Sequence, residues 1–125
     1  LDSENRAFWT GGAEGELRIM HCNSCDRFFH PPHSVCRHCL SDDVDAKAVA
    51  GTGVVDTYTV NYQAWMPDME VPCVIARVAL DDAPEVILTT NIVECDPESV
   101  RIGDRVRVTF EQHDEIFMPL FKKDV

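Results

Sequence analysis

The sequence predicts a mainly β protein in which a short N-terminal helix and a cysteine-rich ribbon precede a small five-stranded barrel. Two observations support this fold class. Four of the six cysteines lie in two C-x-x-C pairs between residues 22 and 39. From residue 47 onward, runs rich in Val, Ile, Thr and aromatic residues alternate with turn compositions. We therefore expect two units, residues 1–46 for the helix and ribbon and residues 47–125 for the barrel.

The N-terminal unit begins with SENRAFW at residues 3–9, which predicts a short amphipathic helix with Ser3 as its N-cap. The glycine-rich segment 11–15 is expected to end this helix. Residues 16–22, ELRIMHC, alternate apolar and polar positions and predict a strand that leads into the first cysteine pair. After the second pair, the polar residues 41–46, SDDVDA, are expected to form a linker.

The second unit contains five segments with strand character, residues 48–62, 73–81, 85–93, 105–112 and 116–123. Gly51 and Gly53 suit a bend or bulge in the first strand, and Pro119 favours an edge or bulge in the last. Residues 96–100 predict one helical turn before the fourth strand, and residues 102–104 predict a turn. Five short strands with such a helical insertion are typical of an OB-fold barrel.

The two C-x-x-C pairs are Cys22 with Cys25 and Cys36 with Cys39, and ten residues separate them. Each pair predicts a knuckle whose sulfurs point the same way, so two facing knuckles supply a tetrahedral four-sulfur site. We interpret this pattern as a site for one structural zinc ion. Four thiolates close the coordination sphere and leave no open position for a substrate or an activated water. Iron in the same geometry and thiol redox chemistry are the alternatives.

Other metal-ligating side chains surround these pairs, namely His21, His30, His33 and His38. One of these histidines could replace a thiolate, and the alternative is that they lie on a solvated ribbon surface. The remaining cysteines, Cys73 and Cys95, lie in or beside predicted strands, where we expect them to be small buried hydrophobes.

The chain is acidic, with 11 Lys and Arg against 22 Asp and Glu and a formal net charge of −11. Such a surface repels polyanions, so nucleic acid is not the expected partner. No apolar run approaches the roughly 18 residues that span a bilayer, and no secretory signal is apparent, so we expect no membrane association and a cytoplasmic location. The first residue is Leu1, without an initiator Met, which suggests a piece of a longer polypeptide.

The order of the motifs points to a family. A helix ending in FW, a GEL strand, a cysteine ribbon containing FHPP, GTGVVDTYTV, VIARVAL and IGDRVRVTF follow one another over essentially the whole chain. This order resembles the acyl-CoA-associated family that has a rubredoxin-like zinc ribbon followed by an OB-fold, the domain of unknown function thirty-five. The sequence departs from the usual knuckle at Asp26 and Leu40, where Gly is common, so we expect a distorted second knuckle.

The resemblance implies an accessory protein. Members of this family accompany thiolase-superfamily enzymes, including lipid-transfer-protein-like aldolases, and are often fused to a MaoC-type hydratase or partner one. In bacterial steroid side-chain degradation, such a domain at the end of a hydratase subunit supports the aldolase that cleaves a hydroxy-steroid acyl-CoA. The resemblance therefore implies a hetero-oligomer with a thiolase-fold aldolase and only indirect contact with acyl-CoA.

Segment 61–70, NYQAWMPDME, joins two predicted strands yet contains the large side chains of Tyr62, Trp65, Met66 and Met69. If exposed, these side chains would suit a protein–protein hot spot or an acyl-group wall, and the alternative is a lid over one end of the barrel. Phe8 and Trp9 offer a similar choice between capping the ribbon and docking on a partner. We favour docking, because so small a ribbon has little core to offer.

Coenzyme A would need cations for its phosphates. Arg105 and Arg107 alternate on one face of a predicted strand and together could meet an anion, whereas solvated charges explain them equally well. His113, Asp114 and Glu115 could serve as acid–base groups, but they fall where a turn is expected between the last two strands. We find no nucleophile elbow, phosphate loop or paired-carboxylate motif.

We therefore predict a non-catalytic, zinc-stabilised subunit that binds a thiolase-fold aldolase and helps to form its acyl-CoA entrance. Three alternatives remain open: a nucleic-acid-binding zinc-ribbon and OB module, a subunit that supports another thiolase-type acyl-CoA enzyme, and a stand-alone acyl-CoA enzyme. Salt-dependent binding of single-stranded DNA would indicate the first, and turnover by the isolated chain would indicate the last.

Overall fold

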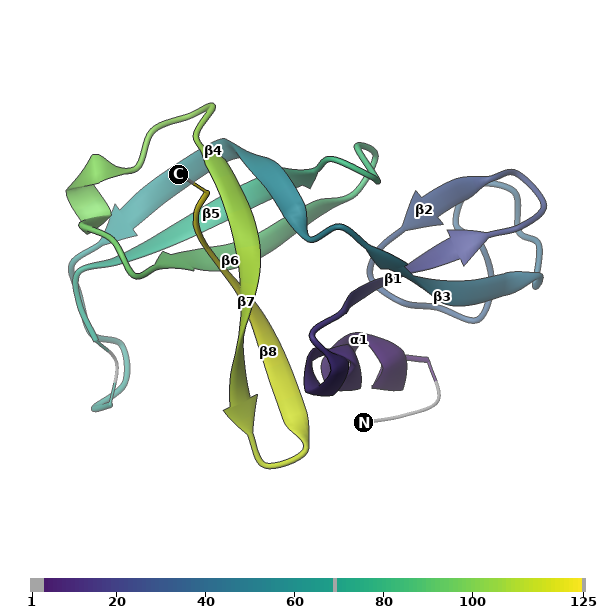
Figure 1. Ribbon diagram of the computed structural model, residues 1–125, viewed down its shortest axis with the longest axis horizontal. Coiled ribbons are helices and arrows are strands. Elements are labelled where there is room, and N and C mark those ends of the chain that lie inside the picture. Colours follow the sequence, from purple (N-terminus) through teal and green to yellow (C-terminus); the bar gives the residue numbers. More distant parts are fainter. Residues whose placement is uncertain (1–3, 69, 125) are drawn as a thin grey trace.

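The computed structural model describes residues 4–68 and 70–124 as a small ribbon sheet beside a closed barrel (Figure 1). In chain order the elements are α1 (Arg6–Thr10), η1 (Gly11–Glu14), β1 (Leu17–Cys22), β2 (Arg27–Phe29), β3 (Val44–Val49), β4 (Thr52–Asn61), β5 (Cys73–Leu80), β6 (Ile87–Val93), η2 (Pro97–Ser99), β7 (Arg105–His113) and β8 (Ile116–Lys123). The predicted fold class, a short helix and ribbon followed by a five-stranded barrel, is confirmed.

The helical segment at the N-terminus extends further than predicted, because a 3₁₀ helix follows α1 directly. α1 has Asn5 at its N-cap position, and the expected N-cap Ser3 lies outside the described residues. The chain does not leave the helix at Gly11 but continues as the 3₁₀ turn η1, which ends at Gly15 with a left-handed φ of 71°. Gly12 is required for packing, since a Cβ there would clash with the Cβ of Phe117.

The ribbon is a three-stranded sheet in the order β2-β1-β3. β1 pairs with β2 from Met20↔Phe29 onward, and it pairs along its whole length with β3, from Leu17↔Val49 onward. Our expectation that residues 41–46 form a linker is therefore wrong in part, because β3 begins at Val44. Its small apolar residues alternate with exposed charges on a sheet edge, which is a weak strand signal. β3 also crosses the expected boundary between the two units after residue 46.

The barrel closes in the order β4-β5-β6-β8-β7. The closure depends on a short antiparallel contact between β4 and β7, from Thr52↔Arg107 to Val54↔Arg105. The expected irregularity in β4 is present, but the register shift lies between Val55 and Thr57 rather than at the glycines. Gly51 provides the predicted bend, with a left-handed φ of 76°, but this bend lies before β4 rather than within it.

One hydrophobic core joins the two units. Phe8 of α1 and Leu17 and Ile19 of β1 belong to the same buried cluster as the inward-facing residues of the barrel strands. The far end of the ribbon has a separate, much smaller core of Cys22, Phe29 and Cys36. The start of the ribbon is therefore held by apolar packing on the barrel, whereas its tip depends on the cysteines. Within the described part of the chain, neither α1 nor any other helix has the length and apolar character to cross a membrane.

Candidate functional site

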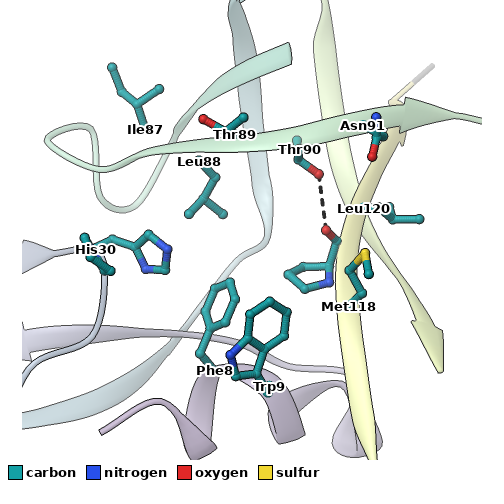
Figure 2. Close-up of a pocket in the computed structure, with 12 residues that line it drawn as sticks. Phe8, Trp9, His30, Ile87, Leu88, Thr89, Thr90, Asn91, Met118 and Leu120 are labelled. Atoms are coloured by element: carbon teal, nitrogen blue, oxygen red, sulfur yellow. Dashed lines mark hydrogen bonds between the residues drawn. The ribbon is translucent and has the colours of Figure 1, made fainter. Parts of the chain in front are cut away.

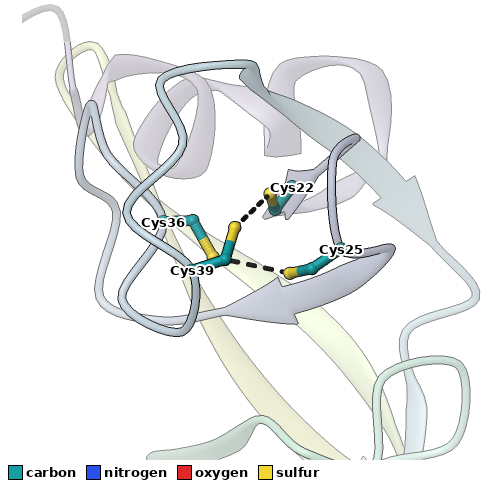
Figure 3. A group of neighbouring side chains, drawn as sticks. All are labelled: Cys22, Cys25, Cys36 and Cys39. Carbon is teal, nitrogen blue, oxygen red and sulfur yellow. Dashed lines mark hydrogen bonds between the residues drawn. The ribbon is translucent and has the colours of Figure 1, made fainter.

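The cysteines of the two knuckles converge at the tip of the ribbon (Figure 3). The sulfurs of Cys22, Cys25, Cys36 and Cys39 all lie within 4.8 Å of one another. The Cys22 and Cys39 sulfurs are 3.5 Å apart, and those of Cys25 and Cys36 are 3.7 Å apart. A Zn–S bond of about 2.3 Å gives a tetrahedron with edges of about 3.8 Å, so the sulfur positions fit a four-thiolate zinc site.

The backbone places these sulfurs through two left-handed residues. Asp26 follows the first knuckle with a φ of 57°, and Leu40 follows the second with a φ of 65°. The N–H of Leu40 donates to the carbonyl of Cys36 at 3.0 Å, and the N–H of His38 donates to the Cys36 sulfur at 3.3 Å. The second knuckle is thus closed by hydrogen bonds despite the distortion that we expected, and the strain lies in Leu40 itself.

The thiols of this cluster do not titrate independently. Burial opposes ionisation of Cys36, but hydrogen bonds from the backbone N–H groups of Cys39 and His38 and from the thiols of Cys25 and Cys22 together lower the pKa of the Cys36 thiol. Burial and hydrogen bonding with Cys22 raise the pKa of the Cys25 thiol to about 12. Without a cation, the cluster therefore resists carrying several negative charges at once. A divalent ion removes that repulsion, and this is the chemistry that a tetrathiolate site provides for.

The nearby histidines have other roles. His21 is buried and hydrogen-bonded through Nε2 to Asp26, at 2.8 Å, and through Nδ1 to Asn23, at 3.2 Å. The ring of His30 packs against Phe8 with centroids 4.8 Å apart. Across residues 4–68 and 70–124, the four cysteines are the cluster able to hold a metal, and no histidine belongs to it. Replacement of a thiolate by a histidine is therefore not what the structure shows.

The loop between β4 and β5 presents its large side chains to solvent. Tyr62 is 61% exposed, Trp65 is 70% exposed and Met66 is 65% exposed. Such exposure does not match a lid packed over the barrel end, which was the alternative. The Tyr62 hydroxyl donates to Glu98 at 2.9 Å, which ties the start of the loop to η2. Met69, the fourth predicted contact residue, lies outside the described residues.

Phe8 and Trp9 differ from each other. Phe8 is only 8% exposed and belongs to the shared core, so its position matches the capping alternative rather than the docking role that we favoured. Trp9 is half-buried and meets Phe8 edge to face, with ring centroids 4.9 Å apart. The physical reason for the difference is that the ribbon packs on the barrel and on α1, which supplies the core that the ribbon alone lacks.

The two arginines of β7 share an exposed face, as predicted, but they are not equivalent. Both terminal nitrogens of Arg105 donate to the carboxylate of Asp81. This pairing raises the pKa of Arg105 and lowers that of Asp81. Because Arg105 is already paired with the Asp81 carboxylate, the two arginines are poorly suited to bind a phosphate together. Asp81 also accepts from Thr52 at 2.7 Å and links three strands at the seam of the barrel.

A groove that we did not predict lies between the helix, the ribbon and the barrel. It has a volume of about 420 Å³ and runs between β6 and the part of β8 around Pro119, with Phe8, Trp9 and His30 along its side (Figure 2). The groove is formed by strand divergence and by the docking of α1. Neither property leaves a signal in the sequence.

Comparison with known proteins agrees with this geometry. Residues 9–45 match a family model described as the rubredoxin-like zinc ribbon domain of ChsH2, and residues 46–111 match the C-terminal OB-fold domain of ChsH2. The chain belongs to the ChsH2 zinc-ribbon and OB-fold family. The predicted family resemblance is thereby confirmed, and so is the predicted cofactor, one structural zinc ion bound in a zinc ribbon with four clustered cysteines.

Three relatives of this ChsH2-family chain have descriptive names. The "Probable enoyl-CoA hydratase alpha subunit" of Thermomonospora curvata is 35% identical over 98% of this chain and 39% of the relative. The "DUF35 domain-containing scaffold protein" of Methanothermobacter thermautotrophicus is 30% identical over 73% of this chain and 68% of the relative. The "3-oxo-4,17-pregnadiene-20-carboxyl-CoA hydratase alpha subunit" of Mycobacterium tuberculosis is 31% identical over 82% of this chain and 32% of the relative. The chain thus spans only about a third of the length of the two hydratase subunits.

Solved structures extend the likeness to three dimensions. A chain of the structure described as "Ltp2-ChsH2(DUF35) aldolase" matches with a TM-score of 0.87 and 32% identity, over 100% of this chain and 98% of that chain. A DUF35 protein of unknown function from Sulfolobus solfataricus matches with a TM-score of 0.66 at 21% identity, which shows the shared fold.

Proposed function

We propose that this chain is a non-catalytic accessory domain that binds and stabilises a thiolase-superfamily, lipid-transfer-protein-like aldolase acting on acyl-CoA substrates. The observation that supports the proposal most strongly is the match over the full chain to a ChsH2-type chain of an Ltp2-ChsH2 aldolase. The OB-fold and the ribbon both align, so the relative placement of the two units is shared as well.

The metal centre supports a structural role. When bound, zinc in a four-thiolate site stabilises the fold and offers no open coordination position for a substrate. The residues that would hold it, Cys22, Cys25, Cys36 and Cys39, lie at the ribbon tip, away from the groove and from the loop between β4 and β5. Zinc would therefore stabilise the ribbon tip rather than take part in a reaction.

We assign the first contact surface to Tyr62, Trp65 and Met66, here called the apolar loop. Its side chains are more than half exposed, although large aromatic and Met side chains are usually buried in folded proteins. Such residues are enriched at the energetic centres of protein interfaces. Acidic residues, including Asp96 and Glu98, lie at the base of the loop, so the partner surface should combine an apolar pocket with a basic rim.

The names of two relatives support a substrate class. One relative is named as a 3-oxo-4,17-pregnadiene-20-carboxyl-CoA hydratase subunit and another as an enoyl-CoA hydratase subunit, and this chain covers only 32% and 39% of their respective lengths. We propose that the chain works beside a hydratase of this kind in steroid side-chain degradation and meets acyl-CoA only through its aldolase partner. A cytoplasmic location fits a reduced, zinc-loaded four-thiolate site.

The archaeal scaffold relative favours a second candidate function, support of another thiolase-type acyl-CoA enzyme. Capture of partners from the native host, followed by mass spectrometry, separates the two. The first proposal expects an Ltp2-like aldolase as the main partner, whereas the second expects a different thiolase-fold enzyme in its place.

The direct test is co-expression of the zinc-loaded chain with the Ltp2-like aldolase, followed by size-exclusion chromatography and titration calorimetry. We expect one co-eluting complex, and we expect the double change Trp65→Ala and Met66→Ala to weaken it at least tenfold without lowering the thermal stability of the chain. Ile102→Ala is the matched control, because Ile102 is 68% exposed but lies outside the apolar loop. Separate elution of the wild-type proteins, with a fully active and soluble aldolase alone, would refute the proposal.

A further inference from the structure

The barrel is nearly open between β6 and β8. These two strands are parallel neighbours, but only Ile92↔Phe121 and Val93↔Lys122 pair. β5, on the other side of β6, pairs with it from Ile87 to Ile92. The segment 87–91 is therefore paired along one edge only, and the groove of about 420 Å³ lies along the other edge.

The direction of the backbone groups along β6 can be derived from the ladder. The N–H of Leu80 donates to the carbonyl of Val86, and successive residues of an antiparallel strand alternate in the edge that they address. Leu88, Thr90 and Ile92 therefore address β5, whereas Ile87, Thr89 and Asn91 address the groove. Among the described residues, β8 pairs with β6 only at Ile92 and Val93, so the ladder gives the groove-facing N–H groups of Ile87 and Thr89 no strand partner. Unpaired groups at every second residue are a template for another extended chain.

The facing edge of β8 cannot fill this role itself. Its central residue there, Pro119, has no N–H, and its carbonyl already accepts from the Thr90 hydroxyl at 3.2 Å (Figure 2). This bond crosses the gap between the strands, and the residues of β6 and β8 that precede the two paired positions have no ladder between them. β6 thus provides the N–H donors on one side of the groove, and β8 forms its opposite wall.

The lining of the groove indicates what could lie in it. Its side chains are apolar or neutral, namely Phe8, Trp9, His30, Pro31, Ile87, Leu88, Thr89, Thr90, Asn91, Met118, Pro119 and Leu120. Burial lowers the pKa of His30, which keeps its ring neutral at physiological pH. In a chain with 26% charged residues and a net charge of −11, a lining of this size without a charged side chain selects an uncharged occupant.

We propose that the β6 edge binds an extended, uncharged segment of the partner polypeptide, which adds to the barrel as a strand beside residues 87–91. Main-chain hydrogen bonds to Ile87 and Thr89 would supply affinity, and an apolar side chain of the segment would lie against Trp9 and Met118. This second surface is separate from the apolar loop. It rests on the proposed function for the identity of the partner, the thiolase-fold aldolase.

The test is site-resolved amide hydrogen exchange on the zinc-loaded chain, alone and with the Ltp2-like aldolase. We expect the amides of Ile87 and Thr89 to exchange at least tenfold more slowly in the complex. Thr89→Pro removes one edge donor and should weaken the complex about tenfold, whereas the matched control Thr89→Val keeps the N–H and the side-chain shape and should bind like the wild type. Should the proline variant not fold, the exchange rates of the wild-type chain decide the question.

Three outcomes would overturn the inference, and they are distinguishable. If the complex forms but the two amides exchange as before, the proposed function stands and the β6 edge is not its contact. If decanoyl-CoA alone protects these amides, the groove belongs to an acyl ligand instead. If the wild-type chain and the aldolase do not associate, the proposed function fails and the strand-addition inference fails with it.

Discussion

Removal of the zinc ion should unfold the tip of the ribbon and leave the barrel folded. The small core at the tip contains Phe29 as its one large apolar residue, with Cys22 and Cys36 beside it. The base of the ribbon is different, since Leu17 and Ile19 belong to the core of the barrel. We therefore expect the unfolded segment to begin after Ile19 and to end near Val44, where β3 joins β1.

The relative sizes of the two contributions support this expectation. Complete burial of a Phe side chain contributes about 3 kcal/mol. Zinc binding to structural sites in zinc-finger peptides is worth about 10–16 kcal/mol near pH 7. Apolar packing at the tip, with Phe29 fully buried and Met20 and Val44 only partly buried, is too small to replace the metal.

The assay combines metal release with residue-level protection. A chelator in excess should liberate one zinc ion per chain, and amide exchange should accelerate in β2 and in the Cys36–Cys39 knuckle while Val78 and Leu88 in the barrel core stay protected. Cys36→Ser should reproduce the effect, and Cys73→Ser, outside the cluster, should keep one zinc ion. Complete loss of zinc with unchanged exchange across the ribbon would refute the reasoning.

Three substitutions test other parts of the account. Leu40→Gly should raise the free energy of unfolding of the zinc-loaded chain by about 1 kcal/mol, because the left-handed backbone no longer carries a Cβ and the 77% exposed side chain has little packing to lose; an unchanged or lower melting temperature would contradict this. The Arg105 hydrogen bond lowers the pKa of Asp81, so its stabilisation is present above about pH 4 and is lost as the pH falls through that lowered pKa. Asp81→Asn should therefore lower the free energy of unfolding by at most about 1 kcal/mol near neutral pH. In urea denaturation measured over a pH series, the variant should lose less stability than the wild type as the pH falls below about 4. An unchanged pH dependence would contradict a role of the Asp81 carboxylate in acid stability. Gly12→Ala should destabilise the chain by about 1–3 kcal/mol, since the new Cβ meets Phe117, and a variant as stable as the wild type would show that η1 can shift freely.

Much of the architecture could be predicted because strong local signals coincide with it. The spacing of the cysteine pairs determines that their sulfurs meet, whatever the rest of the chain does. The long alternating runs around Val78 and Leu88 define strands that bury one face, and the structure places both residues in the core. The turn at residues 102–104 and the helical turn η2 also lie where the sequence indicated.

The misses share a physical cause, which is that the decisive contacts are tertiary. β3 is a strand because β1 offers it an edge, and its own residues between Val44 and Val49 give little sign of it. Phe8 is buried because the ribbon and the barrel close around α1, which no local pattern reveals. The open β6 edge arises because β8 pairs with β6 only through Phe121 and Lys122, near the end of both strands, and pairing of distant strands is not encoded in the pattern of either one.

We propose that this chain assists a reaction without performing it. The measurement that tests it most directly is turnover of a hydroxy-acyl-CoA by the zinc-loaded chain alone, by the Ltp2-like aldolase alone and by the equimolar mixture. We expect no turnover by the chain, and faster or longer-lived turnover by the mixture than by the aldolase alone. Two results would contradict this expectation. One is cleavage of the substrate by the isolated chain, and the other is an aldolase whose turnover rate and duration of activity are the same with and without the chain.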